Sequence, residues 1–145
     1  VDKGIIKTYA IGGGIGTMFY TETFFTKDLD VFILPQLTES GIIYLEKLYK
    51  YLRNAGYKME EQYSIIHDIP VDFIPVYDEL TEEALNNAVE KKYEGIKVRV
   101  ISPEYLIAIG LKTGRKQDLM KVELLCKEAK LDCDLLNSIK NRYKL

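Results

Sequence analysis

Residues 26–34 read Thr-Lys-Asp-Leu-Asp-Val-Phe-Ile-Leu, and Pro35 ends the run. The apolar residues 31–34 predict a buried strand, and Asp28 and Asp30 stand at its start. Side chains two positions apart on a strand project to the same face, so the two carboxylates can converge on one point. Such a pair repels unless a cation lies between the charges, and Mg²⁺ prefers oxygen ligands. The pair suits a metal–phosphate site, but Asp-x-Asp is common, and taken alone the pattern favours two solvated acids at a strand end.

A glycine turn precedes this strand. Gly12-Gly13-Gly14-Ile15-Gly16 follows a strand predicted for Lys7 to Ile11 and leads into a short helix, expected at about residues 15–21. A strand–Gly-Gly–helix turn exposes backbone N–H groups and lets a phosphate approach closely. A tight turn with close packing would also use glycine. Acids only fifteen residues after Gly13 favour the phosphate interpretation.

Two other glycine motifs do not fit. The chain lacks Gly-x-x-x-x-Gly-Lys followed by Ser or Thr, which excludes a P-loop. A dinucleotide-binding fold places its acid at the end of the second strand, after the apolar run. Here both acids precede residues 31–34, and no intact Gly-x-Gly-x-x-Gly is present.

Asp72 is the third candidate acid. It lies between Val71 and Phe73 in the apolar segment 69–76. A charge in such a segment is unfavourable unless it is paired or bound to a metal. The alternative is the solvent face of an edge strand, which Pro70 and Pro75 would allow.

The whole pattern predicts an α/β (α+β) fold: a mixed sheet with helices packed on it. We expect one domain over residues 1–145, with a sheet core at about 5–101 and a helical tail at about 102–145. After the strand that begins at Asp28, we expect a helix capped by Thr38 or Ser40 and ended by Gly56, followed by a hairpin of strands 57–66 and 71–77 with His67 and Asp68 in its turn. A helix over 81–93 and a strand over 96–101 should come next. Helices over 102–113, 116–130 and 133–143 should complete the chain.

Composition excludes several classes of protein. The net charge of −2 argues against wholesale wrapping of nucleic acid. The chain has no apolar run of about eighteen residues and no visible signal peptide. Cys126 and Cys133 form no metal-binding or redox motif, so we expect two reduced cysteines in a cytoplasmic protein.

These motifs together resemble a known family. Ala10-Ile11-Gly12-Gly13, the segment 26–33 and Val71-Asp72-Phe73 are similar to the signature of the DNA polymerase β-like nucleotidyltransferase superfamily. The segment 101–106, followed by Lys112, Arg115, Lys116 and Asp118, resembles a downstream motif of small bacterial members. Those members include minimal nucleotidyltransferases and abortive-infection toxin-type enzymes. The resemblance extends from about Tyr9 to Leu125.

The resemblance implies transfer of a nucleoside monophosphate from a nucleoside triphosphate to an acceptor hydroxyl, with release of pyrophosphate. Asp28 and Asp30 would hold two Mg²⁺ (or Mn²⁺) ions against the triphosphate, as in two-metal catalysis. Asp72 would complete one of the metal sites and would also accept the proton of the hydroxyl. The nucleotide-binding residues would be Gly12 and Gly13 at the phosphates, Lys112 at the outer phosphates, and Asp118. The acceptor stays open among an RNA 3′ end, a protein side chain and a small molecule such as an antibiotic.

Two features point in other directions. Many relatives carry arginine where this chain has Phe24, and Lys112, Arg115 and Lys116 would also suit a helix C-terminus. The alternative function is a non-catalytic nucleotide-binding or regulatory domain, as in one half of a toxin–antitoxin pair with a protein partner. The presence of all three acids favours the enzyme.

Overall fold

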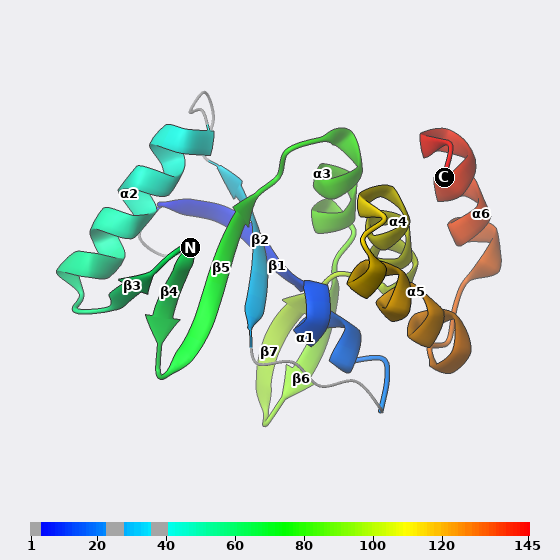
Figure 1. Cartoon of the computed structure of the whole chain (residues 1–145), viewed down its shortest axis with the longest axis horizontal. Coiled ribbons are helices and arrows are strands. Elements are labelled where there is room, and N and C mark those ends of the chain that lie inside the picture. Colours follow the sequence, from blue (N-terminus) through cyan, green and yellow to red (C-terminus); the bar gives the residue numbers. More distant parts are fainter. Residues whose placement is uncertain (1–3, 23–27, 36–40) are drawn as a thin grey trace.

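In a computed structural model that describes residues 4–22, 28–35 and 41–145, seven strands form one sheet and six helices surround it (Figure 1). The strand order is β3-β4-β5-β2-β1-β7-β6. The elements are β1 (Ile6–Gly12), α1 (Gly13–Met18), β2 (Leu29–Pro35), α2 (Gly41–Asn54), β3 (Lys58–Glu60), β4 (Tyr63–Ile66), β5 (Ile69–Pro75), α3 (Glu79–Asn86), β6 (Val89–Tyr93), β7 (Ile96–Val100), α4 (Pro103–Thr113), α5 (Lys116–Glu128) and α6 (Cys133–Tyr143). The predicted mixed α/β class is confirmed.

The central strand β2 divides the core into two clusters. Val31 and Ile33 point to one face and pack with Leu48 and Leu52 of α2. Phe32 points to the other face and joins the cluster formed with the helices that follow β5. This division follows from the alternation of side chains along a strand. In Figure 1, α2 accordingly lies apart from the group formed by α3, α4, α5 and α6.

The predicted helix over 81–93 is wrong in its second half. Helix α3 ends at Asn86, and residues 89–93 form β6, which pairs antiparallel with β7. Glu94 and Gly95 have φ of 51° and 80°, as a tight hairpin turn requires. Pairing with β7 therefore overrides the local helical pattern.

The other boundaries follow the expectations more closely. The turn at His67 and Asp68 is confirmed, since both residues have positive φ, but the strand expected at 57–66 is divided into β3 and β4 at Glu61. Gly56 follows α2 with φ 95°. Small differences concern α1, which begins at Gly13, and α5, which ends at Glu128. The proposed caps Thr38 and Ser40 lie outside the described residues, as does Phe24.

The helical tail begins as the sequence predicts. Ser102 is the N-cap of α4, Pro103 is its first residue, and Gly114 ends it in the left-handed conformation. Helix α6 has the predicted bounds, and both cysteines are free and exposed. None of the helices in the described part of the chain is long and apolar enough to cross a membrane.

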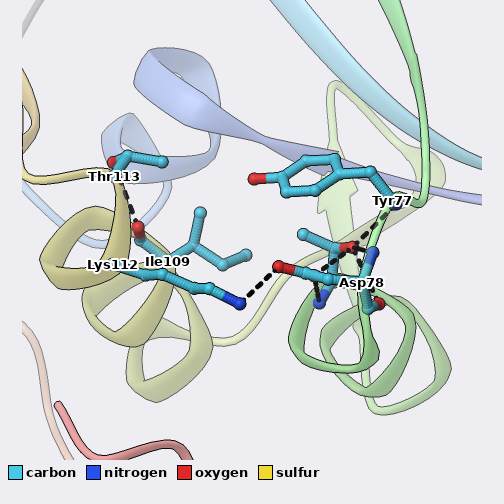
Figure 2. Close-up of polar contacts among 6 residues, drawn as sticks. Tyr77, Asp78, Ile109, Lys112 and Thr113 are labelled. Carbon is cyan, nitrogen blue, oxygen red and sulfur yellow. Dashed lines mark hydrogen bonds and ion pairs between the residues drawn. The ribbon is translucent and has the colours of Figure 1, made fainter.

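Asp78 joins the start of α3 to the end of α4 (Figure 2). Its Oδ1 accepts a hydrogen bond of 2.8 Å from the backbone N–H of Thr81, and the Thr81 hydroxyl accepts one from the backbone N–H of Asp78. Its other oxygen, Oδ2, lies 2.7 Å from Nζ of Lys112. One carboxylate thus serves both as a helix cap and as an ion-pair partner.

Two substitutions separate these roles. Asp78→Ala removes cap and ion pair, and we expect it to lower the free energy of unfolding by about 1–2 kcal/mol. Asp78→Asn keeps a capping oxygen and loses only an exposed ion pair, so its loss should stay below about 1 kcal/mol. Urea unfolding measures both, and equal losses would contradict the capping role.

Candidate active site

Three neighbouring strands place the glycine turn and two acids in one row. Gly12, the last residue of β1, lies opposite Asp30 of β2, and Asp30 lies opposite Asp72 of β5. Paired residues on adjacent strands are about 5 Å apart, and on parallel strands they point to the same face. The row therefore brings Asp30 and Asp72 together beside the turn. Asp28 lies just before β2.

Gly13 lets Asp30 approach the turn closely. Its φ is 56°, and a Cβ at this position would lie 2.1 Å from Oδ2 of Asp30. No other residue fits this space without moving the carboxylate. Thr17, only 1% exposed, fixes the turn from within α1 by donating a 2.9 Å hydrogen bond to the carbonyl of Gly13.

The acids carry the electrostatic signs of mutual repulsion. Burial, followed by the charges of Asp72 and Asp28, raises the pKa of Asp30 from 3.8 to about 6. Burial and then the charge of Asp28 raise the pKa of Asp72. The Asp28 charge also raises the pKa of the Tyr63 hydroxyl, after burial as the larger cause. The charge of Asp28 thus acts on both other carboxylates, and the native structure disfavours ionisation of Asp30 and Asp72.

The three carboxylates are neighbours but do not form a preassembled metal-binding site. Within the part of the chain that the structure describes, no three Asp, Glu, His or Cys side chains lie close enough to hold one metal ion. Contrary to the expectation from sequence, the carboxylates of Asp28, Asp30 and Asp72 therefore do not converge on one metal position in this conformation. Like charges that repel keep their side chains apart when no cation compensates them.

Two cations, one at the N-cap of α5 and one within that helix, face Asp30 from the helical tail. Arg115 and Lys121 both oppose the rise in the pKa of Asp30. Asp118, 5% exposed, lies between them: it accepts 2.7 Å and 2.8 Å hydrogen bonds from Arg115 Nε and the Thr113 hydroxyl, and Lys121 Nζ is 3.8 Å away. Burial alone would raise the pKa of Asp118, but these hydrogen bonds outweigh it and the pKa is lowered. Asp118 therefore anchors cations at the site.

A cleft of about 130 Å³ joins Asp30 and the two cations, whereas Gly12, Asp28 and Asp72 are not among the residues that line it. Gly13 and Asp30 form one side, and Arg115 and Lys121 form another, over an apolar floor that includes Phe32. Its polar rim also holds Tyr77, Thr113 and Asp118. Tyr77 is 58% exposed, and Figure 2 shows its ring between the strand end and α4.

Lys112, predicted at the outer phosphates, lies elsewhere in this conformation. Its amine bonds to Asp78, and it is not among the residues that line the cleft (Figure 2). Lys121 and Tyr77 do line it, and sequence reasoning missed both. The three-residue spacing of Arg115, Asp118 and Lys121, which places them on one face of a helix, was the available signal.

A family model described as "Nucleotidyl transferase of unknown function (DUF2204)" matches residues 1–144. The chain belongs to this family. No curated protein has a significantly similar sequence.

Solved structures of nucleotidyltransferases share the fold of this family member. The solution structure of the antibiotic-resistance factor ANT(2″)-Ia matches 99% of the chain and 84% of its own, with TM-score 0.57 and 17% identity. The crystal structure of ANT(2″)-Ia with adenylyl-2″-tobramycin matches 99% and 90%, with TM-score 0.52 and 18% identity. An antigenic nucleotidyltransferase-like protein from Paracoccidioides brasiliensis has TM-score 0.55 and 16% identity over 81% of this chain, which spans only 66% of that protein.

Gly13→Ala tests the close approach of Asp30. Gly95 supplies a matched control, because it also has positive φ but a Cβ there would meet nothing within 4 Å. Backbone strain alone should cost each variant about 1–2 kcal/mol of unfolding free energy. The Gly13 variant should lose more, because its Cβ displaces Asp30. Equal losses by urea unfolding would mean that the carboxylate is not held against the turn.

Asp30→Asn tests the repulsion. An acid whose native pKa is raised from 3.8 to about 6 destabilises the fold as pH rises through that window. The variant, measured without metal, should match the wild type near the lower value and gain up to about 3 kcal/mol above the upper one. Urea unfolding across this range measures the difference, with the exposed turn acid changed in Asp68→Asn as control. A constant difference at all pH values would refute the raised pKa.

Proposed function

We propose that this chain transfers a nucleoside monophosphate from a nucleoside triphosphate to an acceptor hydroxyl and releases pyrophosphate. One observation carries the proposal: the register that aligns Gly12, Asp30 and Asp72 across three strands, beside a cleft that Arg115 and Lys121 also line. Membership in a nucleotidyltransferase family supports the same chemistry.

Arg115 and Lys121 are the groups we assign to the outer phosphates. They line the cleft, whereas Lys112 reaches a phosphate only after leaving Asp78. A volume of about 130 Å³ suits part of a triphosphate and is too small for a whole nucleotide. The nucleoside would then extend out of the cleft past the exposed ring of Tyr77. Backbone N–H groups at the Gly12-Gly13 turn would complete the phosphate contacts.

The donor chemistry of the three acids fits a divalent cation, although their carboxylates would have to move closer together to hold one. The donors are carboxylate oxygens, the ligands that Mg²⁺ and Mn²⁺ take, and the raised pKa of Asp30 marks charge that a cation would compensate. Asp28, Asp30 and Asp72 would hold it. When bound, such an ion would supply positive charge to the oxygens on which negative charge develops during the transfer.

Asp72 is the base in this proposal. It takes the proton of the acceptor hydroxyl while that oxygen forms a bond to the α-phosphorus, and the bond from that phosphorus to the β-phosphate oxygen breaks. The raised pKa of Asp72 suits this task, because a base works best when its pKa is near the operating pH. Arg115 and Lys121 receive the negative charge of the departing pyrophosphate.

The acceptors to test include a hydroxylated small molecule. One structural neighbour, ANT(2″)-Ia, is solved with adenylyl-2″-tobramycin, in which an adenylyl group is joined to a small molecule. An RNA 3′ end and a protein side chain complete the set.

Labelling the α- or the γ-phosphate of the nucleoside triphosphate distinguishes nucleotidyl transfer from phosphoryl transfer. The protein is incubated with Mg²⁺ and each nucleoside triphosphate, labelled at the α- or γ-phosphate, together with cell lysate or tobramycin. Label should enter an acceptor from the α-phosphate only.

Asp72→Asn should lower the rate by at least about a hundredfold, as expected for loss of a general base. Lys121→Ala should be slower than Lys127→Ala, an exposed cation at the other end of α5. Transfer from the γ-position, or nucleotide binding without transfer, would overturn the proposal.

A further inference from the structure

A second and larger cavity, about 510 Å³ in volume, lies away from the cleft. Its walls come from the end of the α1 region, from β6, from the start of α4 and from the loop between α5 and α6. Its lining shares no residue with that of the cleft. The two sites contact opposite ends of α4, a helix of eleven residues that spans about 16 Å.

Two hydroxyls at this cavity lack partners. Tyr20 OH and Ser102 Oγ are buried and make no hydrogen bond within the described part of the chain. Ser102 is only 7% exposed, and although it is the N-cap of α4 its side chain makes no capping bond. A buried hydroxyl without a partner costs about 1–3 kcal/mol, so such groups are usually satisfied by something that binds.

Glu104 brings a buried negative charge to the same wall. It is 6% exposed, and its one hydrogen bond among the described residues is a long one of 3.5 Å from the backbone N–H of Asp132. No cation pairs with it in that part of the chain. A buried carboxylate is unfavourable unless it is paired or fully hydrogen-bonded.

The other charged groups around the cavity are engaged or peripheral. Lys91 Nζ lies 5.2 Å from the ring centroid of Tyr20, and the Asp132 side chain accepts a 3.1 Å hydrogen bond from the backbone N–H of Leu135. Glu90 and Lys130 are exposed, one of each sign. The inner wall therefore holds one carboxylate and two covered hydroxyls, which a ligand reaches once their side chains rotate toward the cavity. A carboxylate without a cationic partner favours a cationic donor with further polar groups.

We infer that this cavity binds a small hydroxylated amine, with its ammonium on Glu104 and, after rotation of the two side chains toward the cavity, its hydroxyls on Ser102 and Tyr20. The charge-assisted hydrogen bond to Glu104 supplies most of the selectivity, because the uncharged hydroxyls can both donate and accept. The site is separate from the nucleotide cleft, and its existence does not depend on the proposed transfer reaction.

Matched pairs of probes test the ammonium requirement. Glucosamine and tris(hydroxymethyl)aminomethane carry the amine, whereas glucose and glycerol are uncharged counterparts. In NMR titrations of the ¹⁵N-labelled full chain, both amines should shift the amide signals of Ser102, Glu104 and Asp132, and the uncharged compounds should not. No shift with either amine, as expected if ordered water alone satisfies the hydroxyls, would overturn the inference. Equal shifts with the uncharged compounds would do the same.

Two variants locate the binding. Glu104→Gln should weaken the binding of both amines at least about tenfold, because a charge-assisted bond is lost. Ser102→Ala removes an unpaired hydroxyl, so it should leave thermal stability without amine unchanged or raised while weakening binding, which keeps the test valid if the first variant folds poorly. Asp134→Asn, at an exposed acid of α6, is the control. Undiminished binding in both site variants would place the amine elsewhere.

Discussion

The approach of Asp30 to the turn at Gly13 is the contact on which the site depends. The carboxylate occupies the space in which any other residue would carry its Cβ, and the backbone there has a positive φ that glycine adopts without strain. The same turn ends β1 and begins α1, so the positions of the end of β1, the first helix and the Asp30 carboxylate all depend on the packing at this turn. Pairing of β2 with β5 then carries Asp72 to the same row.

This row creates an electrostatic problem that the helical tail partly solves. Burial and like charge make ionised Asp30 unfavourable, while Arg115 at the N-cap of α5 and Lys121 within α5 act in the opposite direction. Asp118 holds Arg115 in place from a buried position. The cleft is therefore electropositive on its helical side and electronegative on its sheet side, a division suited to a phosphate chain that bears negative charge and to a cation beside it.

Helix α4 connects the elements that build both cavities. Gly110 lets α5 pack closely, since a Cβ there would lie 2.7 Å from a methyl group of Val122. At the other end of α4, the polar side chains of the N-cap Ser102 and of Glu104 in the first turn are buried instead of facing solvent. One rigid helix of about three turns thus supports the wall of the cleft and the wall of the second cavity, with different residue types at each end.

The sequence by itself determined the local features. The apolar run at residues 31–34 with two acids before it identified β2, glycines identified the turn, and Ser102-Pro103 and Gly114 delimited α4, because each signal acts within a few residues. Only the tertiary structure decided the rest. Residues 89–93 became a strand through pairing with β7, Lys112 found Asp78 across thirty-four positions, and Lys121 came to face Asp30. Such outcomes depend on which distant elements meet, and periodicity within one segment contains no information about that.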